Sequence, residues 1–231
     1  MLYTMNIGIS VLIPLYNGIE FLEESLQSVL LQTHKKWEII IGINGHKKDS
    51  DVERHANNIV NKYNGNNIYD IRVIYYETKG KPFTLNSMVN DIKYDYIALL
   101  DVDDIWFPQK LEKQLPLLYT YDVVGTQCRY FGNMTGIPSI PVGDITMHNF
   151  FNSNPVINSS IIIHKDNAKW NDEFLEDYDM WFRLKYEGKT FYNLSEILCK
   201  HRIHQQSHFN SVSGNFLGKL KTKWQNIYND R

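Results

Sequence analysis

Apolar and polar segments alternate along the first half of the chain. Apolar runs of strand length occupy residues 7–15, 37–43, 71–76, 96–100 and 123–126. Runs of this kind are typical of strands buried on both faces of a parallel sheet. Helices are expected between them: residues 20–32 have apolar residues at helical spacing, residues 51–63 form a polar helix, and residues 82–92 and 108–119 are helices with proline at their start. The alternation predicts right-handed β-α-β units, and therefore an α/β protein with a mostly parallel sheet.

The second half of the chain has a less regular pattern. Residues 129–155 carry glycine and proline without periodicity, which indicates a long loop that offers binding surface. A short strand at 161–163, a helix at 173–187 and an extended segment at 197–204 follow. The tail at 216–228 places its apolar residues on one helical face, which favours a helix packed on its own domain over a membrane-surface helix.

Polar residues gather where the predicted strands end. Ligands of parallel α/β sheets bind beyond the carboxyl ends of the strands, so Tyr16, Asn44 and the acids Asp101, Asp103 and Asp104 could share one pocket. Three carboxylates this close repel one another unless a hard divalent cation neutralises them. A solvated turn with a helix cap is the alternative. An EF-hand loop is excluded because its sixth position would hold tryptophan instead of glycine.

A second acidic element lies in the predicted helix at 173–187. Asp177 shares a helical face with Phe174 and Trp181. A carboxylate on an apolar face is costly unless it is paired or functional, and partial desolvation raises its pKa towards that of a general base. A capping or buried, ion-paired aspartate is the alternative. Asp179 lies one turn before Arg183, which predicts a surface ion pair.

The extended segment near the end of the chain carries a third set of polar residues. Lys200, Arg202 and His204 would lie on one side of it, while His201 is interpreted as structural. Two cations and an imidazole suit a phosphate group, or a metal shared with phosphate. With the acids, they describe displacement of a nucleoside diphosphate: metal and cations stabilise the leaving group, and a carboxylate takes a proton from the attacking hydroxyl.

Composition narrows the function further. The 231 residues suffice for one sizeable domain, and the formal net charge of −2 gives no case for nucleic-acid binding. Cys128 and Cys199 lack metal-site spacing, which favours a reduced compartment. The sequence has no apolar run of membrane-spanning length and no signal-peptide pattern, so we expect a cytoplasmic protein or one peripheral at a membrane surface. Dinucleotide and P-loop motifs are absent.

Five segments occur in one order across residues 7–207: ISVLIPLYNG, WEIII, LLDVDDIWFPQKLEKQL, EDYDMWFRL and RIH. In this order they resemble glycosyltransferase family 2, the inverting enzymes with the GT-A fold. The resemblance implies a single GT-A-like domain over residues 1–231, with a mostly parallel central sheet flanked by helices. Its parts would be a nucleotide-binding half at 1–126, an acceptor and catalytic half at 127–210, and a C-terminal helix at 211–231.

The resemblance also implies roles for single residues. Asp103 matches the principal ligand of Mn²⁺ or Mg²⁺, with Asp101 and Asp104 helping to hold metal and donor sugar. Asp177 matches the catalytic base, and His204 is a further candidate metal ligand. The residues expected to contact the nucleotide-diphosphate sugar are Pro14, Tyr16, Asn17, Asn44, Lys81, Asp101, Asp103, Arg202 and His204.

One stretch departs from the family pattern. Many relatives follow the second strand with Asp-Asp-Gly-Ser, whose first aspartate contacts uracil, but this chain has Ile43-Asn44-Gly45-His46. Ile43 cannot accept a hydrogen bond from a base, so a UDP-sugar is only the default donor; Asn44 or Asp49 could substitute for the aspartate. Residues 154–155 and 158–160 fall where relatives often shape the acceptor side.

These features together predict a metal-dependent inverting glycosyltransferase. It would move one sugar from a nucleotide-diphosphate sugar to a hydroxyl of a glycan, lipid or protein. The Ile43 stretch leaves open a second class, a module that binds nucleotide sugars without turnover. A metal-dependent phosphohydrolase could use the same acids and is the third possibility; it predicts phosphate release from simple esters.

Overall fold

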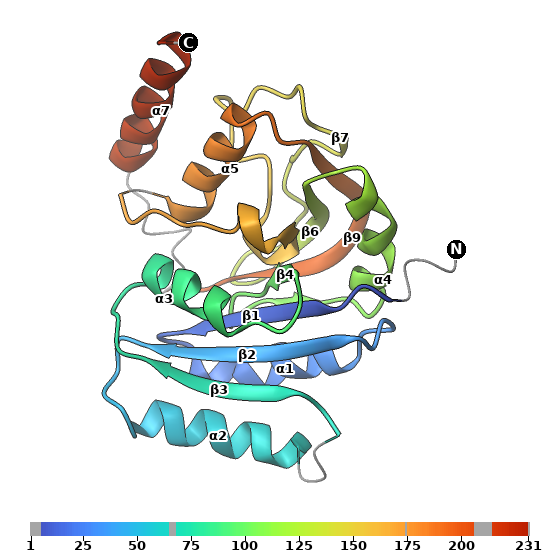
Figure 1. Cartoon of the computed structure of the whole chain (residues 1–231), viewed down its shortest axis with the longest axis vertical. Coiled ribbons are helices and arrows are strands. Elements are labelled where there is room, and N and C mark those ends of the chain that lie inside the picture. The colour runs from blue at the N-terminus through green and yellow to red at the C-terminus, as the bar shows by residue number, and fades with distance from the viewer. Residues whose placement is uncertain (1–5, 65–67, 174, 206–213, 231) are drawn as a thin grey trace.

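The computed structural model describes residues 6–64, 68–173, 175–205 and 214–230, so Phe174 lies outside the described residues (Figure 1). Its strands are β1 (Ile9–Leu15), β2 (Trp37–Asn44), β3 (Ile71–Tyr76), β4 (Tyr96–Leu99), β5 (Ile105–Trp106), β6 (Val123–Gly132), β7 (Gly143–Asp144), β8 (Ile162–His164) and β9 (Phe191–Ile203). Its α-helices are α1 (Leu22–Leu30), α2 (Asp51–Asn64), α3 (Lys81–Met88), α4 (Lys110–Gln114), α5 (Glu176–Tyr186) and α7 (Gly214–Asn229). Short 3₁₀ turns are η2 (Ile19–Phe21), η3 (Val89–Asp91), η4 (Leu115–Tyr119), η5 (Asn158–Ser160) and η6 (Lys165–Asn167).

One sheet connects the strands in the order β3-β2-β1-β4-β8-β6-β9-β5, with β7 paired to β9. The pairs β1–β2, β1–β4, β2–β3 and β6–β9 are parallel, as the alternation of strands and helices predicted. β8 runs antiparallel between β4 and β6, and β5 and β7 pair antiparallel with β9. The sheet is therefore mostly parallel, and the acid-bearing end of β4 lies at the carboxyl edge of the parallel strands.

The sheet is buried on both faces because its apolar strands alternate their side chains between two cores. Val11 and Ile13 of β1 pack with the apolar faces of α1 and α2, whereas Leu12 points to the opposite face. On that face Leu12 joins the core that α3, α5 and α7 complete. Figure 1 shows α1 and α2 beside β2 and β3, and α5 and α7 at the opposite end of the molecule.

The second half is more ordered than its sequence suggested. β6 extends to Gly132, inside the predicted loop at 129–155, and the long β9 begins at Phe191, before the predicted segment at 197–204. The predicted boundary at residue 126 falls within β6. These two strands are parallel, and their register places Cys128 opposite Cys199, where both cysteines are free and buried.

The C-terminal helix packs on the domain. Leu220 and Trp224 of α7 are buried, and Trp224 stacks on Phe182 of α5 with ring centroids 6.0 Å apart. In the described part of the chain, none of the helices combines the length and the apolar character needed to cross a membrane.

Candidate active site

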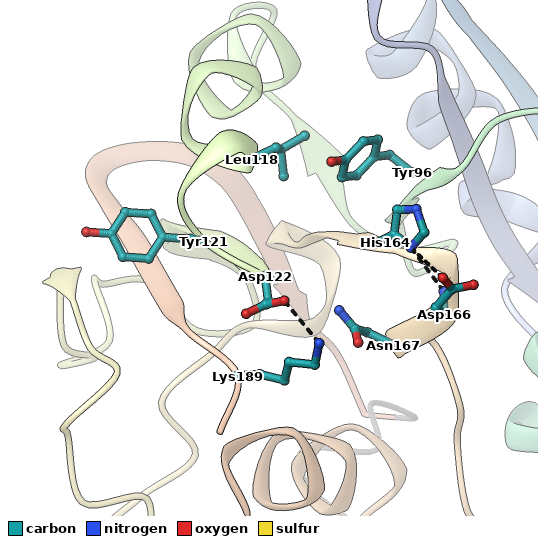
Figure 2. Close-up of a pocket in the computed structure, with 8 residues that line it drawn as sticks. All are labelled: Tyr96, Leu118, Tyr121, Asp122, His164, Asp166, Asn167 and Lys189. Atoms are coloured by element: carbon teal, nitrogen blue, oxygen red, sulfur yellow. Dashed lines mark hydrogen bonds and ion pairs between the residues drawn. The ribbon is translucent and has the colours of Figure 1, made fainter. Parts of the chain in front are cut away.

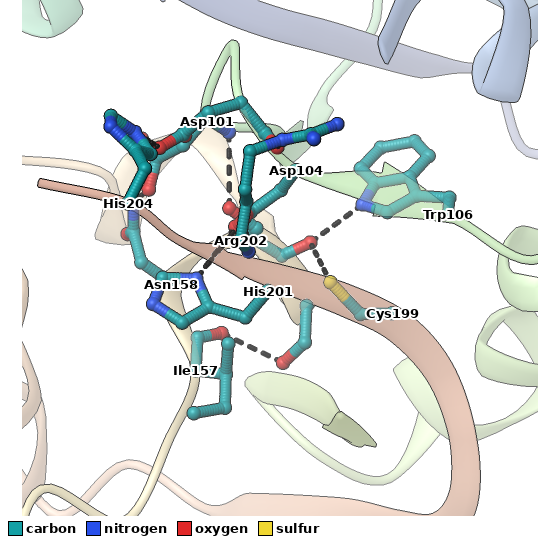
Figure 3. A network of polar contacts seen from close by, with 12 residues as sticks. Asp101, Asp104, Trp106, Ile157, Asn158, Cys199, His201, Arg202 and His204 are labelled. Atoms are coloured by element: carbon teal, nitrogen blue, oxygen red, sulfur yellow. Dashed lines mark hydrogen bonds and ion pairs between the residues drawn. The ribbon is translucent and has the colours of Figure 1, made fainter. Parts of the chain in front are cut away.

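Three acids follow β4 in a tight turn, and each carboxylate faces a different partner. The backbone N–H of Asp104 donates to the carbonyl of Asp101 at 3.0 Å and so closes the turn. The backbone N–H of Asp101 donates to Ser159 Oγ at 3.0 Å, which connects the turn to η5 (Figure 3). Separate partners relieve the repulsion that three adjacent carboxylates would otherwise produce.

Asp101 is neutralised by a lysine. Its Oδ1 lies 2.7 Å from Lys81 Nζ, and its Oδ2 accepts a hydrogen bond of 3.2 Å from Asn158 Nδ2. Burial opposes ionisation of Asp101, but the adjacent Lys81 charge prevails and holds its pKa below the ordinary value. Asp101 is therefore an ionised group that two side chains from other elements keep in place.

Asp103 forms a pair with His204. Its Oδ2 lies 2.9 Å from His204 Nε2, and the two side chains are 20% and 24% exposed. Burial, followed by the charges of Asp104 and Asp101, raises the pKa of Asp103. A partly exposed carboxylate whose charge is disfavoured, beside an imidazole, is suited to receive a cation.

Asp104 is buried, with a side chain that is 0% exposed. Its oxygens face His201 Nδ1 at 3.0 and 3.1 Å, and Oδ1 also accepts the backbone N–H of Arg202 at 2.8 Å. Burial opposes the charge of His201, yet the neighbouring Asp104 raises the pKa of His201 to about 9. These contacts differ from those of the metal ligand that the sequence predicted, because both oxygens are engaged within the protein. Through its contacts with His201 and the Arg202 backbone, Asp104 connects β9 to the acidic turn.

The Arg202 side chain lies among groups that the sequence did not connect with it. Its Cζ sits 4.5 Å from the ring centroid of Phe21 and 4.2 Å from that of Phe131. Its Nε donates to the carbonyl of Asp103 at 2.9 Å, and its guanidinium also pairs with Glu24. Arg202 thus holds the backbone of Asp103 in place; contact with a diphosphate stays a prediction.

Lys81 links the acidic turn to α5. Its Nζ lies 2.7 Å from Asp101 and 3.3 Å from Glu176, the first residue of α5. Burial disfavours the charge of Lys81, but Asp101 and Glu176 more than compensate and raise its pKa. The lysine predicted to face phosphate is thus held between two carboxylates, and it draws the first turn of α5 towards β4.

Asp177 is half-buried in the first turn of α5. Its Oδ1 accepts the backbone N–H of Tyr178 at 2.7 Å, and its Oδ2 accepts a hydrogen bond of 3.2 Å from Asn154 Nδ2. Burial, followed by the charge of Glu176, raises the pKa of Asp177 to about 6. A carboxylate with this pKa is mostly ionised at neutral pH and is still a useful base.

The predicted surface ion pair of Asp179 with Arg183 is wrong. Arg183 pairs with Glu187 at 3.0 Å, whereas Asp179 is 1% exposed. Asp179 accepts hydrogen bonds from Trp224 Nε1 at 2.7 Å and from Lys223 Nζ at 3.0 Å. The reason is tertiary, since α7 packs over the face of α5 that the sequence left to solvent.

Four of the residues predicted to contact the nucleotide-diphosphate sugar lie at the ends of β1 and β2. Pro14 is within β1, Tyr16 and Asn17 follow it, and Asn44 ends β2. Tyr16 is exposed, with its ring 5.4 Å from that of His46, whereas Asn44 is buried. β1 pairs with both β2 and β4, so the residues share the end of the sheet that carries Asp101. Ile43 is buried in the core.

The pair of Asp103 and His204 is a candidate for binding a metal ion. Within the described ranges, there is no group of three or more His, Cys, Asp or Glu side chains arranged to hold an ion. One carboxylate oxygen and one imidazole nitrogen are nevertheless donors that Mn²⁺ accepts, and oxygens of a phosphate ligand or water can complete such a site. The pair therefore fits a metal ion whose other coordination positions are filled by a bound ligand or water.

Sequence reasoning missed several neighbours of the site. It gave no role to Glu24, Phe21 or Phe131, which surround Arg202, because nothing in their spacing connects them with residue 202. The sequence placed Asn154 and Asn158 on the acceptor side but did not connect their amides with Asp177 and Asp101, to which they donate. The Asn-Pro pair at 154–155, a turn signal, was the available clue.

A separate polar pocket lies at the opposite edge of the sheet (Figure 2). It is lined by Tyr96, Leu118, Tyr121, Asp122, His164, Asp166, Asn167 and Lys189. Tyr96 is the first residue of β4, so the pocket lies at the strand starts, away from Asp101. Its charges are paired locally: Lys189 lies 3.3 Å from Asp122, and His164 lies 3.3 Å from Asp166.

The fold is that of the GT-A glycosyltransferases, as comparison with solved structures shows. TarS of S. aureus, solved with UDP-GlcNAc, superposes with a TM-score of 0.71 and 16% identity over 90% of this chain and 62% of TarS. The mannosyltransferase PcManGT of Pyrobaculum calidifontis, solved with GDP-Man and Mn²⁺, gives a TM-score of 0.66 and 12% identity over 88% of this chain and 59% of that protein.

Sequence comparison identifies the family. The profile described as Glycosyl transferase family 2 matches residues 10–163. EpsE of Bacillus subtilis, which is named as a glycosyltransferase, is 31% identical over 86% of this chain and 74% of EpsE. An uncharacterized glycosyltransferase of Rickettsia conorii is 26% identical over 89% of this chain, which spans only 35% of that relative. The chain belongs to glycosyl transferase family 2, and the predicted family and fold class are confirmed.

Proposed function

We propose that this chain transfers a sugar from a nucleoside diphosphate sugar to an acceptor hydroxyl, with inversion at the anomeric carbon. The observation that carries the proposal is the bridge of Lys81 between Asp101 and Glu176, at 2.7 and 3.3 Å. This bridge holds the turn of α5 that carries Asp177 against the acid-bearing end of β4. Donor-side acids and a candidate base therefore belong to one site, which a single displacement requires.

Asp177 serves as the base in this proposal. Its carboxylate takes the proton of the acceptor hydroxyl while the hydroxyl oxygen bonds to the anomeric carbon. The bond from that carbon to the diphosphate breaks on the opposite face, and its electron pair leaves with the diphosphate. With a pKa of about 6, Asp177 is mostly ionised at neutral pH and more basic than an ordinary aspartate.

Asp103 and His204 would hold the divalent metal, Mn²⁺ or Mg²⁺, that this reaction class uses. Bound there, such an ion supplies positive charge where negative charge develops on the leaving diphosphate. The 2.9 Å pair and its partial exposure support this assignment, as does the Mn²⁺ complex of PcManGT. Asp101, held by Lys81 and Asn158, is assigned to the donor. Asp104 is assigned to the protein interior.

The donor is a nucleoside diphosphate sugar, and Pro14, Tyr16, Asn17 and Asn44 are assigned to its base. The structural neighbours were solved with UDP-GlcNAc, UDP and GDP-Man, which supports this ligand class. Because Ile43 is buried and has no polar atom in its side chain, we leave the base open between uracil and guanine. The acceptor is a hydroxyl of a glycan, lipid or protein.

A thermal-shift screen of nucleoside diphosphates and their sugars, with and without Mn²⁺, tests the donor site. Ligands that bind the folded state raise its melting temperature. We expect a metal-dependent increase with one base that disappears in Asp103→Ala. It should persist in Asp95→Ala, which removes an exposed acid paired with Lys165 at the opposite edge. A protein that no nucleotide stabilises at any Mn²⁺ concentration would contradict the proposal.

A binding-only module is the second candidate, supported by the Ile43 stretch. Slow hydrolysis of the bound nucleotide-diphosphate sugar, in which water is the acceptor and free sugar and nucleoside diphosphate are released, distinguishes the two. We expect release of nucleoside diphosphate by the wild-type chain and its loss in Asp177→Asn. Tight binding with no release under any condition would favour the module. Release of phosphate from simple esters would favour a phosphohydrolase instead.

A further inference from the structure

The amide of Asn154 is held in one orientation beside the candidate base. Its Nδ2 donates to Asp177 Oδ2 at 3.2 Å, and its Oδ1 accepts the backbone N–H of Val156 at 3.3 Å. A backbone N–H can only donate, and an ionised carboxylate can only accept. If the amide were reversed, its oxygen would face the Asp177 carboxylate and its NH₂ group would face the Val156 N–H. The hydrogen bonds therefore select a single orientation.

The turn that carries Asn154 is fixed to the core. Asn154 forms an Asx turn with Val156, and Pro155 between them restricts the backbone. The carbonyl of Pro155 accepts a 2.8 Å hydrogen bond from Asn193 Nδ2, and Asn193 is fully buried in β9. Val156 is also buried. The amide therefore projects from a rigid support towards α5.

This contact differs from the other contacts of Asp177 in its origin. Tyr178 N–H belongs to the same helix, so it moves with Asp177. Lys81, Glu176 and Asp101 act on Asp177 through their charge. Among the hydrogen bonds of the described residues, only that of Asn154 reaches the Asp177 carboxylate from outside α5. It can therefore set the direction of the carboxylate relative to the sheet.

We infer that Asn154 is a positioning residue, whose amide holds the Asp177 carboxylate in the orientation that takes the acceptor proton. The inference rests on the proposed role of Asp177 as the base. It goes further by assigning the orientation of that base to one residue in the loop between β7 and β8. Because the amide donates to the ionised form, it also favours that form against the charge of Glu176.

Two substitutions separate positioning from turn formation. Asn154→Asp keeps the shape of the side chain and an oxygen for the Asx turn, but it replaces the donor with a second carboxylate. Asn154→Ala loses both the turn oxygen and the donor. A role in the turn alone makes alanine the more harmful change, whereas a positioning role makes aspartate at least as harmful, because two carboxylates then face each other.

The first readout needs no substrate. The ionisation of Asp177 is followed by ¹³C NMR in the free protein, and the midpoint should rise from about 6 in the wild type to roughly 7 or above in Asn154→Asp. Asn149→Ala is the matched control. Asn149 forms the same kind of turn, accepting Phe151 N–H at 2.9 Å, but is exposed and outside the site. It should leave the Asp177 midpoint unchanged.

The second readout is turnover of the donor that the thermal-shift screen identifies, with water as the acceptor. We expect kcat to fall about tenfold in Asn154→Asp while the donor KM stays within twofold, because the substitution acts on the base and not on donor binding. The pH at half-maximal kcat should rise with the NMR midpoint. A larger loss in Asn154→Ala than in Asn154→Asp would overturn the inference.

A measurement on the wild-type chain covers the case in which both variants fail to fold. The side-chain amide protons of Asn154 should shift with pH at the same midpoint as Asp177, since they donate to its carboxylate. Amide signals that do not follow this titration would overturn the inference. If they do follow it but no sugar is consumed, the contact stands and the proposed function fails, so the two results are distinguishable.

Discussion

The pKa of a partly buried carboxylate is shifted in opposite directions at the two ends of the parallel strands. At the edge where strands begin, Asp122 accepts the Thr190 backbone N–H at 2.9 Å and hydroxyl at 3.0 Å, and lies 3.3 Å from Lys189 (Figure 2). Burial opposes its ionisation, but these contacts hold the pKa of Asp122 below the ordinary value. At the opposite edge, burial and Glu176 raise the pKa of Asp177.

The lowered pKa of Asp122 contributes to folding stability, whereas the raised pKa of Asp177 suits the proposed chemistry. A carboxylate whose pKa is lowered by folding stabilises the protein above its unfolded pKa, and one whose pKa is raised destabilises it there. Asp122 therefore contributes to folding at neutral pH, whereas Asp177 opposes it. The raised pKa of Asp177 lowers the folding stability, but it gives this residue the intermediate basicity that suits its proposed role.

Replacing the proposed base should give the largest effect on activity. Asp177→Asn keeps the shape of the side chain but cannot take a proton, so turnover should fall by a factor of about 10²–10⁴. Release of nucleoside diphosphate at saturating donor measures it. The nucleotide-dependent thermal shift should remain in the variant. Loss of that shift would place Asp177 in donor binding instead.

The buried acid beside the site should give the largest effect on stability. Asp104→Asn removes a buried carboxylate charge that lies 3.0 Å from His201 Nδ1, so the free energy of unfolding should fall by roughly 3 kcal/mol. Chemical denaturation at neutral pH measures the change. A variant as stable as the wild type, with metal-dependent nucleotide binding abolished, would show that Asp104 acts on the metal directly.

The raised pKa of Asp177 predicts a stability change that depends on pH. Above about pH 6 the folded state carries a charge that it disfavours, so Asp177→Asn should be more stable than the wild type by about 1–3 kcal/mol at pH 8. The gain should shrink as pH falls from 6 to 4, because Asp177 is then protonated in the folded state. Denaturation curves at three pH values suffice. A gain that is constant with pH would exclude the ionisation mechanism.

The same substitution at the other edge should have the opposite sign and the smallest size. Asp122→Asn should lower the stability by about 1 kcal/mol at pH 7, since the lowered pKa of Asp122 stabilises the ionised form. The loss should vanish as pH falls through the folded pKa of Asp122. Turnover should stay within twofold of the wild type, as the pocket in Figure 2 contains none of the proposed site residues. A large loss of turnover would contradict the claim that Asp122 affects stability but not the proposed reaction.

The pattern of strands and helices, the family and the acidic clusters could be predicted from the sequence alone. The apolar run at residues 7–15 predicted a strand buried on both faces, and β1 (Ile9–Leu15) is buried throughout. Local spacing also singled out Asp101, Asp103 and Asp104, which crowd one another after an apolar run, and Asp177, which lies on an apolar helical face. These are properties of neighbouring residues in the chain, which a single sequence displays.

The partner of each charged group depends on how distant parts of the chain pack together. Asp104 looked equivalent to Asp103 in sequence, but the return of β9 places His201 and the Arg202 backbone on it. Asp179 looked exposed until α7 covered it. Asn154, 23 residues before Asp177, reaches the candidate base through a turn anchored in β9. Such contacts depend on how distant segments pack, and the electrostatic energy of a buried group depends on those contacts more than on its own type.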